Sequence, residues 1–262
     1  MTAKPSTPPA PPTPIHQRAW LVGGALRDWT GPVQEVASPV LSGGRPTPLG
    51  SCPLMGEAEA LEALAAAASA WGKGRGPWPS MTVSERIGCV ERFLAAMVAV
   101  REPVVDRLCW EIAKSRPDAE REFDRTVQYA RDTLAALKDL DRTNSRFQQV
   151  DGIVAQVRRA PLGVALCMGP YNYPLNETFT TLLPALVMGN PVIVKPARHG
   201  VLLFEPLLAP FRDAFPPGVV NTIYGDGKTV VTPIVASGSV DVLAFIGTSR
   251  SEEHTSELQS RV

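Results

Sequence analysis

The feature that most constrains the fold is an alternation of short apolar runs with helical segments in the second half of the chain. The apolar runs have the length and composition of buried strands and comprise residues 164–168, 192–195, 219–224 and 240–246. The segments between them have helical periodicity and comprise residues 175–188, 202–215 and 229–236. Helices that connect consecutive strands imply right-handed crossovers and a parallel sheet. The sequence therefore predicts an α/β fold, in which Pro210 is expected to break the second helix.

Polar and glycine-rich residues follow each of the four predicted strands. In an open parallel sheet, ligands bind beyond the carboxyl ends of the strands. The segments at these ends are residues 169–172, 195–198, 225–227 and 247–248. We therefore expect one ligand site to be built from these four turns.

The first half of the chain is predicted to be mainly helical. Residues 56–71 are rich in alanine and leucine, and Thr82 with Glu85 forms a capping-box pattern before a helix over 83–100. Further helices are expected over 103–115 and 118–138, then a polar linker after Lys138 and an extended strand or arm over 150–159. Residues 16–50 are rich in glycine and proline, which indicates irregular structure with short strands.

Composition and charge exclude several classes of function. The 26 basic and 26 acidic residues balance, so nothing global favours nucleic acid or an anionic membrane as a partner. No apolar run approaches the ~18 residues of a membrane span, and the N-terminus lacks an apolar signal core, which together favour a cytoplasmic protein. The four cysteines and three histidines lack metal-ligand spacing, so no metal site is expected.

Asn172 is the first candidate for chemistry. It lies in the turn Pro170-Tyr-Asn-Tyr-Pro174, between a predicted buried strand and a predicted helix. A side-chain amide placed in such a turn can donate a hydrogen bond to a developing oxyanion. Asparagine is also a good helix N-cap, so the residues alone leave a capping role open.

Lys195 and Arg198 are the second candidate pair. Lys195 ends the run Gly189-Asn-Pro-Val-Ile-Val-Lys-Pro196 and stands at the mouth of a predicted parallel strand, where a lysine can bind ribose hydroxyls or a phosphate. Arg198 follows in the same turn, and a guanidinium is a natural partner for a phosphate dianion. An exposed arginine without a ligand remains the alternative.

These two motifs resemble the cofactor-binding half of the aldehyde dehydrogenase superfamily. The resemblance covers roughly residues 50–249, and it is specific over 161–196 and loose before 150. It implies an aldehyde dehydrogenase-like α/β fold in which N-terminal helices pack with a Rossmann-type parallel βαβ cofactor domain that is incomplete at the C-terminus. It implies that Asn172 stabilises the oxyanion of the reacting aldehyde. The cofactor-binding residues that it implies are Met168, Gly169, Pro170, Tyr171, Lys195, Ala197, Arg198, Gly227 and Thr248.

The resemblance also indicates a cofactor and a substrate. Members that prefer NAD often carry a glutamate at the position of Arg198, so NADP is expected here rather than NAD. The segment from Gly169 to Asn176 is most similar to the NADP-dependent non-phosphorylating glyceraldehyde-3-phosphate dehydrogenases. By that similarity, Arg125 and Tyr173 bind the substrate phosphate; a salt bridge between Arg125 and Glu122 on a helix surface is the alternative. Another aldehyde or semialdehyde also remains open as the substrate.

The family's nucleophilic cysteine and general-base glutamate motifs are absent from this sequence. Cys167 falls within a buried strand with no residue placed to form a thiolate, so it is not expected to replace the nucleophile. Residues 250–262 are interpreted as the translation of a sequencing adapter, residues 16–249 as an incomplete cofactor-binding domain and residues 1–15 as a disordered proline-rich tail. We therefore expect an inactive, poorly soluble fragment of a homo-oligomeric parent, with a noncatalytic nucleotide-binding protein as the alternative.

Overall fold

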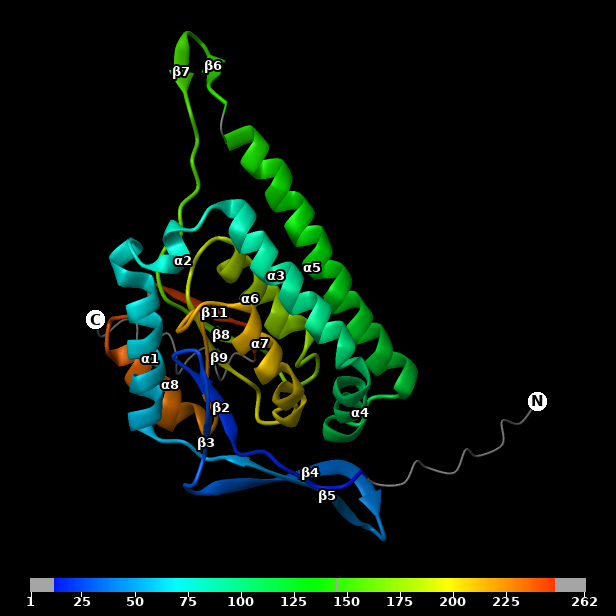
Figure 1. Cartoon of the computed structure of the whole chain (residues 1–262). Helices are drawn as coiled ribbons and strands as arrows, with labels where there is room; N and C mark the ends of the chain where they lie inside the picture. The colour runs from blue at the N-terminus through cyan, green and yellow to red at the C-terminus, as the bar shows by residue number, and fades with distance from the viewer. Residues whose placement is uncertain (1–11, 145, 248–262) are drawn as a thin grey trace, which may run out of the picture.

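A four-stranded parallel sheet forms the centre of the fold, as the sequence predicts (Figure 1). The structure is a computed structural model and describes residues 12–144 and 146–247. The strand order is β10-β9-β8-β11. The strands are β8 (Ala165–Met168), β9 (Val192–Lys195), β10 (Val220–Thr222) and β11 (Val242–Phe245).

Helices cover both faces of this sheet. Alternate side chains of β8 point to opposite faces, so Ala165 and Cys167 join one apolar core while Leu166 and Met168 join the other. The first core contains residues of α3 (Val83–Ala99), α5 (Arg116–Asn144), α6 (Asn176–Val187) and α7 (Leu208–Ala214). The second contains residues of α1 (Glu57–Trp71) and α8 (Gly227–Ala236). Burial on both faces explains why the strands are continuously apolar in sequence.

The helix predicted over residues 202–215 is divided, but not at Pro210. A 3₁₀ segment, η2 (Leu202–Leu207), leads directly into α7 at Leu208. Pro210 lies in the first turn of α7, where the missing N–H would have no intrahelical partner. The predicted break was therefore wrong in its position.

The N-terminal helices include α2 (Pro77–Ser80) and α4 (Arg101–Glu111), which is shorter than predicted. The capping box before α3 is confirmed, because the N–H of Glu85 donates to the Thr82 hydroxyl at 3.2 Å and the Glu85 carboxylate accepts from the Thr82 N–H at 2.8 Å. The linker predicted after Lys138 was wrong, because α5 continues to Asn144. An Arg142–Asp139 ion pair on this polar turn supports the extra helix.

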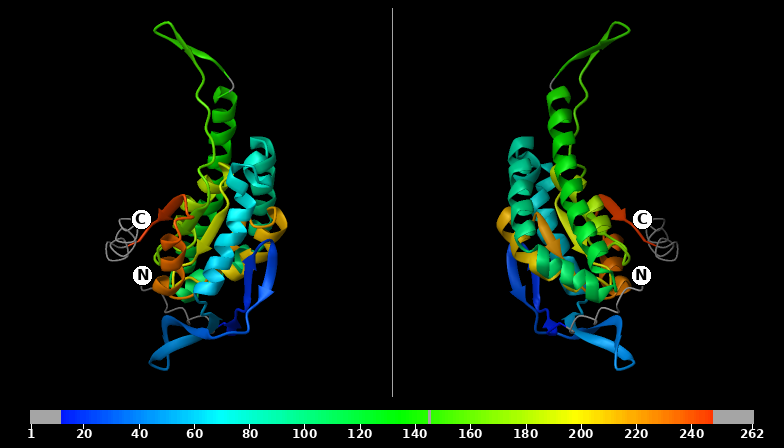
Figure 2. Two further views of the ribbon diagram at one scale, coloured as in Figure 1. Left: turned by 90° about the vertical axis from the view of Figure 1, so that its left-hand side faces the viewer. Right: turned by 90° about the vertical axis from the view of Figure 1, so that its right-hand side faces the viewer.

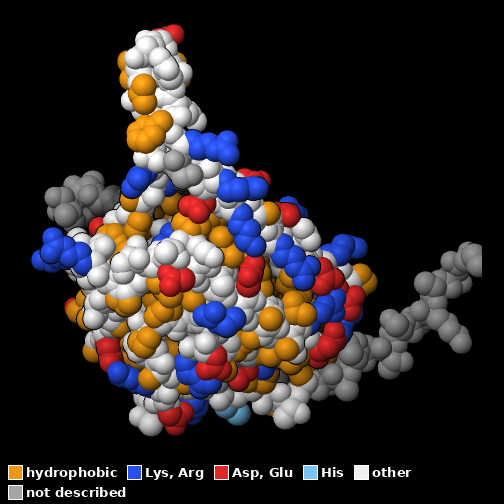
Figure 3. Space-filling view, turned by 45° about the horizontal axis from the view of Figure 1, so that its top comes forward, with side chains coloured by type: hydrophobic (Ala, Val, Ile, Leu, Met, Phe, Trp, Pro, Cys, Tyr) orange, Lys and Arg blue, Asp and Glu red, His pale blue; other side chains and the backbone are white. Residues whose placement is uncertain are grey.

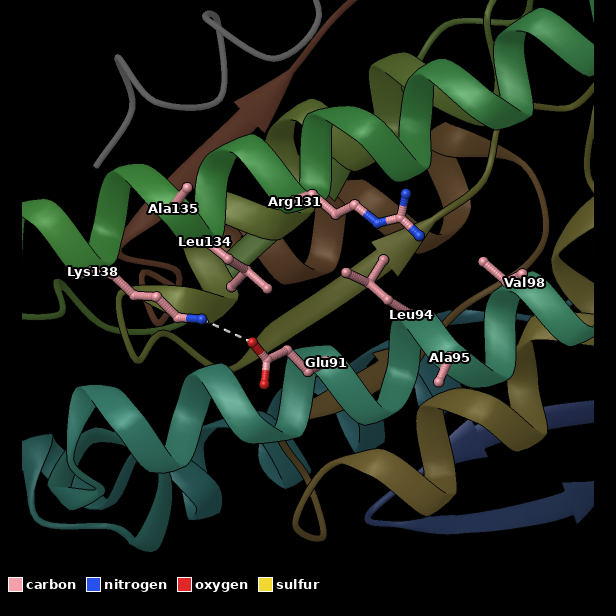
Figure 4. A pocket seen from close by; sticks show the side chains of 8 residues that line it. All are labelled: Glu91, Leu94, Ala95, Val98, Arg131, Leu134, Ala135 and Lys138. Atoms are coloured by element: carbon pink, nitrogen blue, oxygen red, sulfur yellow. Dashed lines mark hydrogen bonds and ion pairs between the residues drawn. The ribbon is translucent and has the colours of Figure 1, made fainter.

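α3 and α5 pack side by side, and a shallow cavity of about 490 Å³ lies between them (Figure 4). Lys138 of α5 and Glu91 of α3 form an ion pair across it at 3.0 Å, with both side chains exposed. This cavity lies away from the carboxyl ends of the strands.

Three hairpins were not anticipated as such. β4 (Val33–Ser42) pairs with β5 (Arg45–Pro53), and β2 (Ala19–Val22) pairs with β3 (Ala25–Asp28), each around a Gly-Gly turn with positive φ at both glycines. Both turns suit the twist of a two-residue hairpin. The short strands predicted within residues 16–50 are confirmed by β2 and β3, whereas the longer β4 and β5 make this region more regular than expected. β1 (Ile15–His16) pairs with β5, so the predicted proline-rich tail is one residue too long, at Ile15. Residues 1–11 lie outside the described residues.

The third hairpin projects from the body of the molecule (Figures 1 and 2). β6 (Gln148–Val150) pairs with β7 (Ile153–Ala155) around Asp151 and Gly152, whose φ angles are 49° and 81°. The arm predicted over 150–159 is thus a hairpin, and an Asp-Gly pair is a strong hairpin signal. Apolar side chains lie on its surface (Figure 3), including exposed Ile153 and Val154.

The two edges of the central sheet differ. β2 lies against β10, where the N–H of Leu21 donates to the Thr222 hydroxyl at 2.9 Å and the N–H of Gly23 donates to the Asn221 amide oxygen at 3.0 Å. β11 pairs only with β8 within the described residues and forms the other edge. None of the helices within residues 12–144 and 146–247 has the length and hydropathy that a membrane span requires.

Candidate active site

The carboxyl ends of the strands meet as the fold requires. Met168 of β8 is in register with Lys195 of β9 on one side and with Phe245 of β11 on the other. The turns that follow these residues therefore leave the sheet side by side, on the edge where parallel sheets bind ligands.

A cavity of about 580 Å³ opens at this edge. It is lined by Gly169–Asn172 after β8, by Ala197–His199 after β9 and by Phe245–Gly247 at the end of β11, together with Glu177 of α6. The cavity thus brings Asn172 together with five of the predicted cofactor-binding residues, which are Gly169, Pro170, Tyr171, Ala197 and Arg198. Met168 lies beneath them in the sheet and is buried.

Asn172 does not cap the helix that follows it. α6 begins after Leu175 without a side-chain cap of its own. Instead, the carboxylate of Glu122 on α5 accepts the backbone N–H groups of Leu175 at 3.0 Å and Asn176 at 3.1 Å. A buried carboxylate at a helix N-terminus also complements the helix dipole. The amide of Asn172, on an exposed residue, is therefore available for a ligand.

Lys195 and Gly227 form a second group next to the cavity. Burial lowers the pKa of the Lys195 ammonium, and the carboxylate of Asp226 partly offsets this. Asp226 caps α8 by accepting the N–H of Lys228 at 2.9 Å, which places Gly227 at the start of the helix. A Cβ on Gly227 would meet nothing within 4 Å, so the space in front of this backbone is open to a ligand. Lys195, at the end of β9, and the open space at the start of α8 therefore lie at the edge where parallel sheets bind ligands.

Arg198 and His199 are the exposed basic side chains among the described residues that line this cavity. Neither makes an ion pair or a hydrogen bond with any residue that the structure describes. The ring of His199 lies edge-on to that of Tyr171, with centroids 6.4 Å apart. Two unpaired side chains of this kind suit an anionic ligand.

Arg125 and Tyr173 line a different cavity, of about 520 Å³. Lys114, Asp118, Arg121, Glu122 and Asn176 complete its lining. The alternative salt bridge between Arg125 and Glu122 is absent, because Glu122 pairs with Lys114. The Lys114 ammonium also lies 3.6 Å from the centroid of the Tyr173 ring. Asn172 lines the first cavity, and Tyr173, the next residue of the same turn, lines the second.

Cys167 has the properties of a buried core residue. It lies within β8 with no exposed surface, and burial raises the pKa of its thiol to about 12. A thiol of this kind remains protonated and is a poor nucleophile. Among the described residues, no cluster of three or more histidine, cysteine or acidic residues could hold a metal ion. Thr248 and residues 250–262 lie outside the described residues.

Sequence reasoning did not single out His199, Glu177, Lys114 or Arg121 as residues of these cavities. His199 had a local signal, since it follows Arg198 in the turn after β9. The other three lie on helices or between them, where only tertiary packing brings them to a cavity.

Comparison with known proteins shows the family of the chain. The profile of the aldehyde dehydrogenase family matches residues 29–261. The chain belongs to this family. Its α/β fold is also that of solved members: the NADP complex of an NADP-dependent glyceraldehyde-3-phosphate dehydrogenase from Bacillus halodurans C-125 superposes with a TM-score of 0.80 at 27% identity, covering 93% of this chain and 51% of that one.

Curated relatives of the chain are also dehydrogenases of aldehydes, and their names give different substrates. The NADP-dependent glyceraldehyde-3-phosphate dehydrogenase of Streptococcus equinus is 31% identical over 215 residues, which are 80% of this chain and 44% of that protein. The N-succinylglutamate 5-semialdehyde dehydrogenase of Burkholderia mallei (strain SAVP1) is 29% identical over 229 residues, or 87% of this chain and 45% of that protein. The chain thus spans about half the length of these aldehyde dehydrogenases and belongs to a family of oxidoreductases.

Proposed function

We propose that this chain is the cofactor-binding part of an enzyme that oxidises an anionic aldehyde, with glyceraldehyde 3-phosphate as the first substrate to test and NADP as the hydride acceptor. The observation that carries the proposal is that two adjacent residues of one turn line two cavities: Asn172 lines the cavity that contains Arg198, and Tyr173 lines the cavity that contains Arg125.

In this proposal Lys195 and Gly227 hold the adenosine end of the cofactor, and the 169–171 turn, Met168, Ala197 and Thr248 border its path. Arg198 contacts the 2′-phosphate, because it is exposed and has no partner among the described residues. The bound cofactor would accept the hydride. The NADP dependence of the Streptococcus equinus relative supports this preference.

Asn172 donates its amide hydrogen to the aldehyde oxygen as that oxygen gains negative charge, which favours the charged state of the reaction. Arg125 and the Tyr173 hydroxyl hold the anionic end of the substrate in the second cavity. The carboxylate of a semialdehyde would bind the same guanidinium of Arg125. The Burkholderia mallei relative, a semialdehyde dehydrogenase, supports this second candidate.

We also infer that the parent enzyme is a homo-oligomer. The β6–β7 hairpin exposes Val150, Ile153 and Val154 by 62–69% on a segment that projects from the body. Apolar side chains gathered on a projecting surface favour a protein contact.

The test is to sequence the genomic locus outward from the Val240 codon and to assay the protein of the longest reading frame on a panel of aldehydes. We expect NADPH formation with glyceraldehyde 3-phosphate and none with the 262-residue chain, which lacks an activated cysteine in its described part. Preference for an uncharged aldehyde would contradict the proposed substrate. Aldehyde-dependent NADPH formation by the 262-residue chain would contradict its inactivity.

A further inference from the structure

His199 and Glu177 are ionisable residues of the larger cavity that no step of the proposed function uses. His199 is exposed, lies directly after Arg198 and makes no hydrogen bond with any residue in the described ranges. Its ring lies edge-on to that of Tyr171, from the turn after the neighbouring strand. The side chain therefore faces the space in which the proposed function places the cofactor.

Few charged side chains of the described residues line the cavity around His199. Arg198 shares its turn, Tyr171 faces it from the turn after β8 and Glu177 faces the cavity from the first turn of α6. The part of β11 and its following turn that lines the cavity, Phe245–Gly247, brings no ionisable side chain. A proton on the imidazole would thus add a second positive charge beside Arg198, and Glu177 is the one carboxylate among the described residues that line the cavity.

We propose that His199 is a further cofactor-binding residue, which binds a phosphate of the dinucleotide when its imidazole is protonated. The inference rests on the proposed function, since it requires a nucleotide in this cavity. Histidine is the side chain whose charge ordinarily changes between pH 5 and 8, and an imidazolium donates a charge-assisted hydrogen bond to phosphate. Affinity for the nucleotide therefore rises as the pH falls.

Two phosphates of the cofactor present the same chemistry, the 2′-phosphate and the pyrophosphate. They are distinguished by comparing NADPH with NADH, because only NADPH carries the 2′-phosphate. A gain confined to NADPH assigns His199 to the 2′-phosphate, and an equal gain for both assigns it to the pyrophosphate.

The experiment measures NADPH and NADH binding to the full chain by nucleotide fluorescence at pH 6.5 and 8.0, for the wild type and for His199→Gln. The substitution is made at an exposed residue, and circular dichroism confirms that the variant is folded. We expect wild-type affinity for NADPH, or for both nucleotides, to rise roughly two- to fivefold at the lower pH relative to the variant, as for an exposed ion pair. The 2′-phosphate itself protonates near pH 6, and this acts equally on both proteins.

Three outcomes decide the matter. A pH effect that is lost in His199→Gln supports the inference. Nucleotide binding with the same pH dependence in both proteins overturns it and leaves the proposed function intact. Failure of the folded wild-type chain to bind either nucleotide overturns both this inference and the proposed function.

Discussion

The carboxylate of Glu122 accepts the backbone N–H of Leu175 at 3.0 Å, from a helix 53 residues earlier in the chain. This contact fixes the start of α6 and therefore the turn that presents Asn172 and Tyr173. Lys114 joins the same arrangement, because its ammonium pairs with Glu122 and lies over the ring of Tyr173. The helical N-terminal half thus positions the turn on which the proposed chemistry depends.

Replacing Glu122 by alanine should therefore destabilise the fold strongly. The change leaves the Leu175 and Asn176 N–H groups and the Lys114 ammonium without their buried partner, which typically costs about 3–5 kcal/mol. Urea unfolding of the two proteins measures the loss. Glu91→Ala is the matched control, since it breaks an exposed Glu–Lys pair and should cost no more than about 1 kcal/mol. Similar losses in both variants would contradict the capping role.

A second buried carboxylate makes stability depend on pH. Glu111 accepts the N–H groups of Leu202 at 3.0 Å and Leu203 at 2.9 Å, yet burial raises its pKa from 4.5 to about 7. The folded state holds the proton of Glu111 more tightly than the unfolded state does. The stabilisation of the fold that results from this difference is therefore complete below pH 4.5. It is lost as the pH rises to 7 and above.

The matched variant is Glu111→Gln, which keeps an acceptor oxygen and removes the titration. Between pH 4.5 and 8 the wild type should lose on the order of 3 kcal/mol of unfolding free energy relative to the variant. Denaturant unfolding at the two pH values measures the difference. Parallel pH profiles for the two proteins would show that the buried carboxyl is not the cause.

The cysteines should react slowly and unequally. Cys52, Cys89 and Cys167 are buried, and burial raises the pKa of Cys52 and Cys167 to about 12, whereas Cys109 is only half-buried. Brief alkylation of the native chain, followed by peptide mass spectrometry, should modify Cys109 first and leave Cys167 intact. Rapid and selective alkylation of Cys167 would mean that a reactive thiol stands at the candidate site after all.

Arg125 should bind the anionic end of a ligand. Titration of the chain with 3-phosphoglycerate, the product of the proposed reaction, should show affinity weakened about tenfold by Arg125→Ala, as for the loss of one charge-assisted hydrogen bond. Arg131→Ala is the control, because Arg131 lies on the same helix but lines the separate α3–α5 cavity. Equal weakening by both changes would indicate only a general charge effect.

The parallel sheet and its ligand edge could be predicted from the sequence because both depend on local patterns. Strands such as Val192–Lys195 are continuously apolar, and their polar residues follow at the carboxyl end. The Gly-Gly and Asp-Gly turns carried an equally local hairpin signal, which the prolines of β4 and β5 obscured at the turn between those two strands.

The remainder of the site depends on contacts between distant segments. Glu122 was expected on a helix surface, and only the packing of α5 against α6 makes it a buried cap. Likewise, the contact of the Lys114 ammonium with the Tyr173 ring results from tertiary packing, because no local sequence pattern links the two residues.

Calorimetric titration of the 262-residue chain with NADPH and NADH, for the wild type and for Arg198→Glu, tests the central claim most directly. The account predicts that NADPH binds the wild type about tenfold more tightly than NADH, and that the substitution abolishes this difference by placing a carboxylate beside the 2′-phosphate. Equal affinity of the wild type for the two nucleotides, or a preference that survives the substitution, would contradict it.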